Sequence, residues 1–89
     1  MSHDKPITVL YFAAASTATG LTSEEVLLPK YPYKLSHLAE LLSERHTGNL
    51  RKVLKSSQWS VNAEMIDDAE AVYLKGGEEV AVICPVSGG

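Results

Sequence analysis

One segment in the middle of the chain has the apolar spacing of an amphipathic helix, and it limits the possible folds more than any other feature. Four apolar residues recur there at positions i, i+3, i+4 and i+7 of a helix: Leu35, Leu38, Ala39 and Leu42. Ser36 is suited to cap the first turn of this helix, and Gly48 is suited to end it. The apolar stripe has to be buried, and the strand-like segments on either side of it favour a β-sheet as the surface that buries it.

The segments before and after this helix have the composition and alternation of β-strands. We expect strands at residues 7–12, 24–28, 59–65, 72–74 and 80–83. Within the third of these, Val61 and Ala63 are expected to face inward. Residues 13–23 are small and polar and indicate a loop, 30–33 a connector, and 50–54 a second, short helix. Gly76 and Gly77 favour a tight turn before the last strand, because glycine accepts positive φ angles.

The order strand, strand, helix, strand, strand, strand predicts an α+β fold. Its compact form is a ubiquitin-like β-grasp, in which one main helix packs across a mixed sheet. We predict a single β-grasp domain over residues 1–89. The last strand is expected to end at Pro85, because proline cannot donate a hydrogen bond to a sheet, and residues 85–89 are expected to project as a flexible C-terminal tail.

The composition argues against several classes of protein. A net charge of −3 is unlike that of a basic nucleic-acid-binding module. The longest apolar run, residues 9–15, is far shorter than the roughly 20 residues of a membrane span. The polar first six residues lack the pattern of a signal peptide. The single cysteine, Cys84, excludes an internal disulfide, so we expect a reducing, cytoplasmic location.

Acidic residues are concentrated in the last part of the chain. Residues 56–89 contain six acidic residues and one basic residue, Lys75, whereas residues 1–55 contain seven basic and five acidic ones. The acidic segment is either a solvated surface or a docking face for a basic partner, to which Glu78 and Glu79 would contribute.

No group of residues has the spacing of a usual catalytic or metal site, and we expect no bound metal. Three histidines lack the spacing of metal ligands and are expected at the surface: His3, His37 and His46. Asp67 and Asp68 are adjacent, but aspartates of this kind form turns more often than catalytic pairs. Trp59 is expected to pack in the core or in an interface rather than to stack on a nucleic-acid base.

The last five residues carry the chemistry that stands out. Pro85, Val86 and Ser87 are followed by Gly88 and Gly89. Two residues without a Cβ atom can lie extended in a channel too narrow for side chains, and they leave the terminal carboxylate open to attack. Activation of that carboxylate by ATP, as an acyl-adenylate, would let sulfur replace AMP and form a thiocarboxylate. The tail would then be a tethered carrier that partner enzymes hold in reacting geometry. The alternative is a frayed end without function.

Three stretches of the chain together carry a resemblance to a known family: residues 9–13 with Thr19 and Gly20, the pair Val61 and Asn62, and residues 77–81 together with 85–89. They resemble the small-subunit family of molybdopterin synthase, the sulfur carriers of molybdenum-cofactor biosynthesis. The resemblance covers about residues 7–89, and its final stretch, which ends in Val-Ser-Gly-Gly, is the most specific.

This resemblance implies a cytosolic sulfur carrier in a heterotetramer of two small and two large subunits. An activating enzyme with adenylating and sulfurtransferase activities would consume ATP to adenylate Gly89, which would then receive sulfur as a thiocarboxylate. Gly88, Ser87, Val86 and Pro85 would form the tail threaded into the large subunit, where the catalytic pocket is expected. There the sulfur would pass to cyclic pyranopterin monophosphate to build the dithiolene. The chain would contribute to catalysis as the sulfur donor and would bind no permanent cofactor.

The resemblance also raises alternatives for individual residues and for the function. Phe12, Met65 and Ile83 match positions where the family places apolar contacts with the large subunit, and ordinary core packing is the other interpretation. Cys84 replaces the first proline of the family's Pro-Pro pair, which raises the idea of a persulfide on its thiol. The competing functions are a ubiquitin-like protein modifier, a sulfur carrier for thiamine synthesis or tRNA thiolation, and a binding module with an inert tail.

Overall fold

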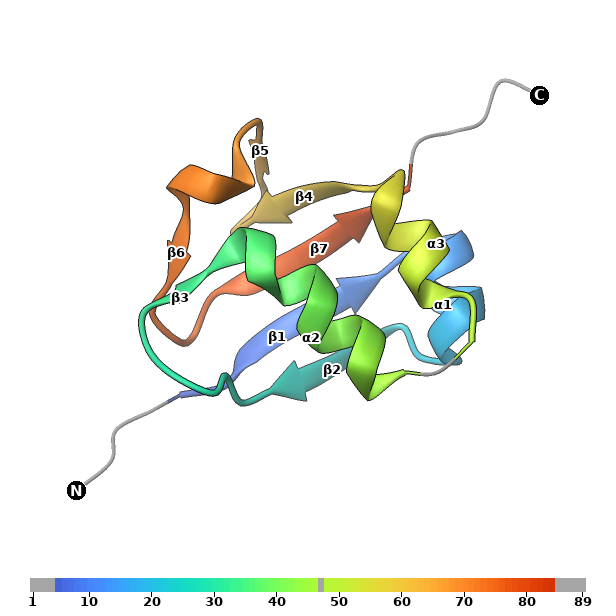
Figure 1. Cartoon of the computed structure of the whole chain (residues 1–89), viewed down its shortest axis with the longest axis horizontal. Helices are drawn as coiled ribbons and strands as arrows, with labels where there is room; N and C mark the ends of the chain where they lie inside the picture. The colour runs from blue at the N-terminus through green and yellow to red at the C-terminus, as the bar shows by residue number, and fades with distance from the viewer. Residues whose placement is uncertain (1–4, 47, 85–89) are drawn as a thin grey trace.

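A five-stranded mixed sheet forms the centre of the computed structural model, which describes residues 5–46 and 48–84 (Figure 1). Its strands, in the spatial order β2-β1-β7-β4-β5, are β1 (Ile7–Tyr11), β2 (Ser23–Val26), β4 (Gln58–Val61), β5 (Glu64–Ile66) and β7 (Glu79–Ile83). The central strands β1 and β7 are parallel, and the other neighbouring pairs are antiparallel.

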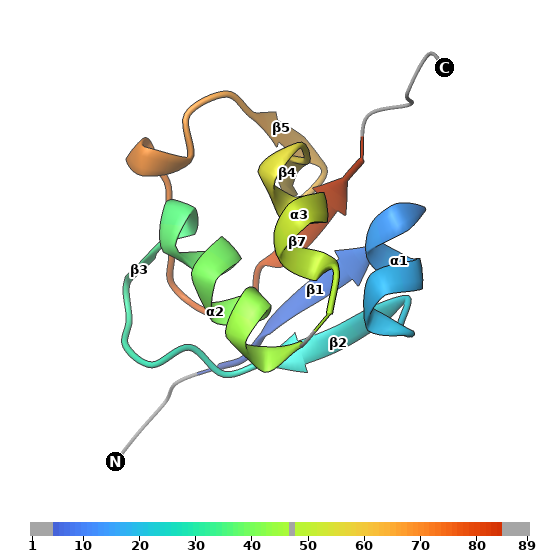
Figure 2. The ribbon, with the colours of Figure 1, turned by 45° about the vertical axis from the view of Figure 1, so that its right-hand side comes forward.

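Helices pack against this sheet on one side. The helices α2 (Leu38–Arg45) and α3 (Leu50–Lys55) lie across one face, as both ribbon views show (Figures 1 and 2). The remaining elements are α1 (Ala14–Thr19), a small sheet of β3 (Tyr33–Lys34) and β6 (Tyr73–Leu74), and the 3-10 turns η1 (Leu35–His37) and η2 (Ala69–Ala71). The predicted α+β arrangement, a mixed sheet with its main helix packed across it, is confirmed. No helix in the described part of the chain is long and apolar enough to cross a membrane.

The core lies between the sheet and the helices. Alternate residues of the two central strands are fully buried: Ile7, Val9, Tyr11, Val80 and Val82. Leu38 and Leu42 of α2 and Leu50 of α3 are fully buried against them, which confirms the predicted apolar stripe. Because successive strand residues point to opposite faces, the intervening residues lie on the face away from α2. We call this the open face.

The predicted loop at residues 13–23 contains the helix α1. The three consecutive alanines at residues 13–15 favour a helix, and the fully buried side chain of Ala15 anchors it to the core. Gly20 ends the helix in the left-handed conformation, with its N–H bonded to the carbonyl oxygen of Ser16. The prediction failed because serine and threonine at the other positions obscured this signal.

Residues 59–65 form a hairpin rather than the single strand predicted. Asn62 and Ala63 have φ angles of 51° and 69°, and this pair of left-handed residues reverses the chain between β4 and β5. Val61 is half-buried as expected, but Ala63 is exposed at the turn rather than facing inward. The Asn62 N–H donates to the Glu79 carbonyl oxygen at 2.8 Å, and the Glu79 N–H donates to Asn62 Oδ1 at 2.9 Å, which fastens the turn to β7.

The entry into the main helix also differs from the prediction. The chain passes through η1 before α2 begins, and no side chain caps either element, so Ser36 is not the expected cap. Tyr33 and Lys34 form the short strand β3 at the end of the predicted connector, because they pair with β6 from a distant part of the chain. The second, short helix is present as α3.

Candidate functional site

The five residues that the sequence singled out as a reactive tail lie outside the described residues. These are Pro85, Val86, Ser87, Gly88 and Gly89. Their roles in threading and in accepting sulfur therefore stay predictions. Cys84 immediately precedes them and is described, so the surroundings of Cys84 define the part of the protein next to the predicted tail.

Cys84 lies where the two central strands end together. Tyr11 pairs with Val82 in the parallel register of β1 and β7, so both strands finish at the same edge of the sheet. The Cys84 thiol donates to the carbonyl oxygen of Phe12 at a sulfur–oxygen distance of 3.4 Å. The Ser57 hydroxyl, just beyond α3, lies 3.7 Å from the same sulfur atom. Cys84 is thus held between the end of β1 and the end of α3.

The three residues predicted to contact a large subunit share the open face. Met65 pairs with Ser60, which pairs with Ala81, so the row across β5, β4 and β7 points away from α2. Ile83 is two residues beyond Ala81 on the same face and is half-buried. Phe12 follows β1 and is 48% exposed, and Met65 is 52% exposed.

This exposure decides between the two interpretations for two of the residues. Core packing is wrong for Phe12 and Met65, because about half of each side chain is in contact with solvent. Contiguous patches of exposed apolar side chains mark protein–protein contacts, whereas single exposed apolar side chains are normal on a protein surface. Contact with a partner stays a prediction for all three residues, Ile83 included.

The acidic segment is not uniformly solvated. The two carboxylate oxygens of Glu78 each accept a backbone N–H at 2.8 Å, from Lys75 and from Gly76. Glu78 therefore closes the turn between β6 and β7, and docking of a basic partner on the acidic segment stays a prediction. Asp68 Oδ1 accepts the N–H of Glu70 at 3.0 Å, which confirms that this aspartate forms a turn.

A cluster of polar side chains around the single carboxylate of Glu24 connects β1, β2 and the end of α2, and the sequence did not reveal it. Glu24 accepts a hydrogen bond from the Tyr11 hydroxyl at 2.6 Å and from Arg45 Nε at 3.0 Å, and its Oε2 lies 2.5 Å from His46 Nε2. Burial opposes the charged form of Glu24, but these hydrogen bonds outweigh it and lower the pKa of this carboxyl. Burial, followed by the adjacent Glu24, raises the pKa of Tyr11.

This cluster has the properties of a structural network. No group of three metal-ligating side chains occurs within residues 5–46 and 48–84. His46 is partly buried in it rather than at the surface as predicted, whereas His37 is exposed and His3 lies outside the described residues. Sequence reasoning missed Glu24 because its partners Tyr11 and His46 are separated from it by 13 and 22 positions along the chain.

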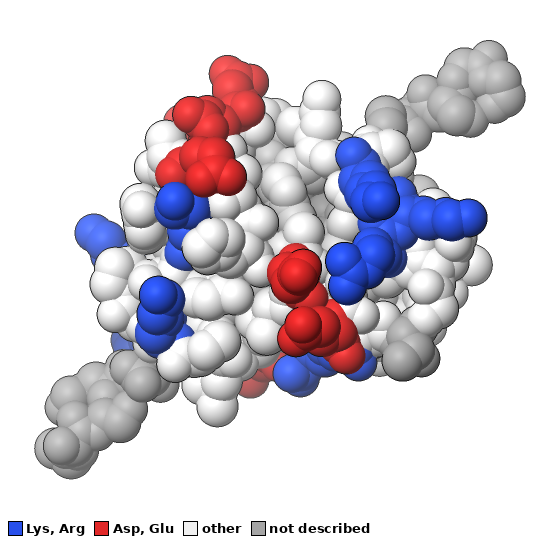
Figure 3. Space-filling model, in the orientation of Figure 1, with Lys and Arg blue, Asp and Glu red and all other residues white. Residues whose placement is uncertain are grey.

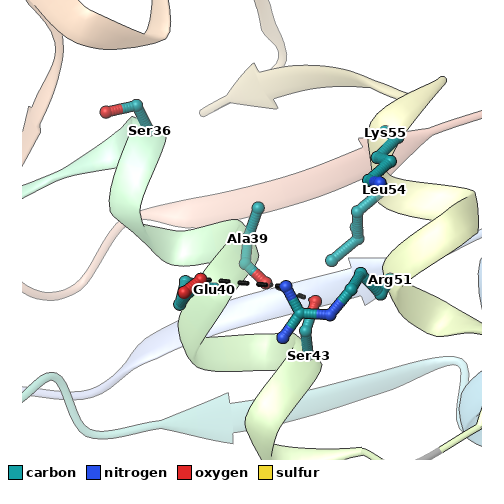
Figure 4. Close-up of a pocket in the computed structure, with 7 residues that line it drawn as sticks. All are labelled: Ser36, Ala39, Glu40, Ser43, Arg51, Leu54 and Lys55. Carbon is teal, nitrogen blue, oxygen red and sulfur yellow. Dashed lines mark hydrogen bonds and ion pairs between the residues drawn. The ribbon is translucent and has the colours of Figure 1, made fainter.

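A shallow groove of about 240 Å³ runs between α2 and α3, but its lining offers no reactive group (Figure 4). Glu40 on one wall faces Arg51 on the other, with 3.8 Å between Glu40 Oε2 and Arg51 Nη1. Ser43 on the α2 side donates to the carbonyl oxygen of Ala39 at 2.7 Å and has no base beside it. The groove separates two helices and is not a catalytic pocket. Trp59 packs in the core, as expected.

Comparison with known proteins relates the whole chain to one family. The model of the ThiS family matches residues 9–89. The molybdopterin synthase sulfur carrier subunit of Mycosarcoma maydis is 41% identical over 93 aligned residues, which cover all of both chains. The protein of the same name from Pyrenophora tritici-repentis is 48% identical over 91% of this chain and 87% of its own length.

Solved structures agree on the fold. A putative molybdopterin converting factor subunit 1 from Pyrococcus furiosus superposes with a TM-score of 0.74 at 24% identity, covering 93% of this chain and all of that chain. A chain in a complex of subunits 1 and 2 of molybdopterin-converting factor from Helicobacter pylori superposes with a TM-score of 0.67 at 21% identity, covering 94% of this chain and 99% of that chain. The chain therefore belongs to the ThiS family and has the ubiquitin-like β-grasp fold.

Proposed function

We propose that this chain is a sulfur carrier subunit of molybdopterin synthase and carries sulfur as a thiocarboxylate on Gly89. The observation that carries the proposal is the end-to-end similarity, at 41% identity, to the Mycosarcoma maydis protein of that name. The family match extends to residue 89 and so includes the Gly88-Gly89 pair.

The chemistry follows from the properties of a carboxylate. An oxygen of the Gly89 carboxylate attacks the α-phosphorus of ATP, which releases pyrophosphate and leaves an acyl-adenylate. A hydrosulfide ion supplied by the sulfur source then attacks the carbonyl carbon, AMP departs as the leaving group, and the sulfur stays on Gly89. In the large subunit, where we expect the catalytic pocket, the thiocarboxylate sulfur forms a bond to a carbon of cyclic pyranopterin monophosphate. Water then cleaves the bond between this sulfur and the Gly89 carbonyl carbon, which leaves the sulfur on the pterin and restores the carboxylate. ATP belongs to the activating enzyme, and the carrier itself holds no permanent cofactor.

Exposed apolar side chains support a large-subunit partner. Phe12 and Met65 are exposed on the open face, at the same side of the sheet as Ile83. The Helicobacter pylori structure is a complex of subunits 1 and 2 of molybdopterin-converting factor, and its matching chain has this fold. We propose that the open face contacts the large subunit in an assembly of two small and two large subunits in the cytoplasm.

The decisive experiment is the incubation of the purified chain with ATP, an activating enzyme and a sulfur source, followed by intact-mass measurement. The mass before incubation verifies that the polypeptide ends at Gly89. A gain that matches exchange of one oxygen for sulfur is expected for the wild type and for Ser87→Ala. Deletion of Gly89 is expected to abolish the gain while leaving thermal unfolding unchanged.

The same material distinguishes the alternatives. The thiocarboxylated wild type, mixed with the large subunit and cyclic pyranopterin monophosphate, is expected to form the dithiolene. Slower-migrating conjugates on denaturing gels would instead indicate a protein modifier. A chain that accepts sulfur but supports only thiazole or tRNA thiolation would indicate a carrier for another pathway. A wild-type chain that gains no sulfur would refute the proposal.

A further inference from the structure

The outward face of α3 is entirely basic, although the chain as a whole is acidic. Its inward residues Leu50, Val53 and Leu54 are buried. Its three outward residues are exposed, and together we call them the basic patch: Arg51, Lys52 and Lys55. Figure 3 shows Lys and Arg side chains gathered over α3, whereas acidic side chains gather over the segment between β5 and β6.

The basic patch is not explained by the stability of the helix. Lys52 and Lys55 lie in the last turn, where positive charge suits the helix dipole, but Arg51 lies in the first turn, where positive charge is unfavourable. Arg51 pairs only loosely with Glu40, at 3.8 Å, and both side chains are more than half exposed, so the pair contributes little. Within the described residues, Lys52 and Lys55 form no ion pair. Most of this charge is therefore available to another molecule.

The basic patch adjoins the residue from which the predicted tail continues. Lys55 ends α3, and Ser57, two residues later, places its hydroxyl 3.7 Å from the Cys84 sulfur. The carbonyl oxygen of Phe12 lies 3.4 Å from the same sulfur atom. Cys84 is thus flanked by two surfaces of different chemistry, the basic patch on the helical side of the sheet and the apolar residues of the open face.

We propose that the basic patch docks onto an acidic surface of the enzyme that adenylates Gly89. This inference rests on the proposed function and names the partner of one surface. A carrier has to leave the enzyme that charges it, and an exposed charged contact speeds encounter without burying a large apolar area. The apolar open face suits the longer-lived complex with a large subunit. The net charge of −3 disfavours a nucleic acid or an anionic membrane as the occupant of the basic patch.

The test compares two double charge reversals with the same change in net charge. Lys52→Glu/Lys55→Glu alters the basic patch, and Lys30→Glu/Lys75→Glu alters two exposed lysines at the opposite end of the sheet, in the loops after β2 and β6 (Figure 1). The readout is pyrophosphate release by the activating enzyme with the carrier at limiting concentration. At low salt we expect the rate of pyrophosphate release with Lys52→Glu/Lys55→Glu to be at least about tenfold lower than with the wild type. The rate with the control should stay within about twofold of the wild-type rate. Near 1 M salt the difference in rate between the two variants should shrink, because salt screens the charges.

Further measurements separate the proposal from its alternatives. Thermal unfolding of all variants, with Lys52→Gln/Lys55→Gln as a version that adds no repulsion, shows whether α3 still folds. Equal rates for the two reversals in folded protein would overturn the proposal, as would a loss of large-subunit binding without a loss of adenylation. Failure of the wild type to release pyrophosphate would refute the proposed function instead. Retention of the wild-type chain on immobilised RNA or on anionic vesicles, abolished by the first reversal, would assign the patch to a polyanion and overturn the inference.

Discussion

The thiol of Cys84 lies 3.4 Å from the carbonyl oxygen of Phe12, a residue 72 positions earlier in the chain. This contact exists because β1 and β7 are parallel neighbours and end at the same edge of the sheet. It gives the cysteine a structural role, since its hydrogen is directed to a backbone oxygen. The persulfide idea would require the same sulfur atom to leave this contact and react.

Replacement of Cys84 by alanine is expected to leave sulfur transfer nearly unchanged. The thiol hydrogen bond would be lost, so we expect the free energy of unfolding to fall by about 1 kcal/mol. Cys84→Ser retains a hydrogen-bond donor, so we expect a smaller fall in its free energy of unfolding. Intact mass after activation measures the transfer, and urea unfolding measures the stability. Loss of the sulfur adduct in a folded Cys84→Ala protein would establish the persulfide instead.

A charged residue in place of Phe12 is expected to weaken binding to the large subunit by at least about tenfold. The variant Phe12→Asp would place a charge in the apolar contact proposed for the open face, and burial of an unpaired charge is costly. Stability should change by only about 0.5–1 kcal/mol, because the side chain is 48% exposed in the native protein. Titration calorimetry with the purified large subunit measures the affinity.

The matched control for this variant is Tyr73→Asp. Tyr73 is also 48% exposed, but it belongs to the small sheet of β3 and β6 rather than to the open face. The Tyr73→Asp variant is expected to bind the large subunit with the affinity of the wild type. Equal affinities for the two variants would remove Phe12 from the interface.

Stability is expected to decrease in acid because of Glu24. Its folded pKa is lowered: burial raises it, but hydrogen bonds from Tyr11, His46 and Arg45 lower it more. A carboxyl with a depressed pKa stabilises the fold above its unfolded pKa near 4.5, and this contribution is lost as the pH falls through the lower folded value. Urea unfolding between about pH 3 and pH 7 measures the effect.

Glu24→Gln provides the comparison for this pH dependence. The amide cannot supply a charged acceptor, so we expect a loss of about 1–3 kcal/mol at pH 7 and a flatter decline in stability below pH 5. The difference in the free energy of unfolding between the wild type and Glu24→Gln should therefore become smaller in acid. A constant difference from pH 7 to pH 3 would show that the charge of Glu24 does not stabilise the fold.

Glu78 and Glu79 are neighbours with different structural roles, and substitution should separate them. Glu78→Ala removes the acceptor of two backbone N–H groups and is expected to cost about 1–3 kcal/mol. Glu79→Ala should change stability by no more than about 0.5 kcal/mol, because its side chain is exposed and only its backbone bonds to Asn62. Thermal unfolding of both variants tests this contrast, and equal losses would contradict it.

Replacement of Ala63 by glycine is expected to stabilise the folded protein. Its φ of 69° is left-handed, and a Cβ atom makes this conformation costly. Ala63→Gly should raise the free energy of unfolding by about 1 kcal/mol, whereas Ala63→Val should lower it because β-branched residues resist this conformation. Urea unfolding measures both changes, and a destabilised glycine variant would contradict the assignment of strain.

The periodicity and composition of the sequence were sufficient to predict the class of fold. The stripe that includes Leu38 and Leu42 predicted the main helix and the face it buries, because helical spacing is a local property. The β-branched and aromatic composition of β1 and the apolar alternation of β7 likewise predicted strands. The hairpin at Asn62 and Ala63 was not predicted, because alanine in a left-handed turn carries none of the usual glycine signal.

Only the tertiary structure decided which distant residues meet. Cys84 lies beside Phe12 because of the order and register of the strands, and Glu24 lies beside His46 because the end of α2 packs over β2. Local periodicity encodes neither arrangement. The same register places Met65 on the open face while the basic residues of α3 lie on the helical side. By itself the sequence determined the class of fold, the main helix with its buried stripe and the chemistry available in its last residues. The positions of the surfaces around that end depended on long-range pairing, which forms only when the whole sheet assembles.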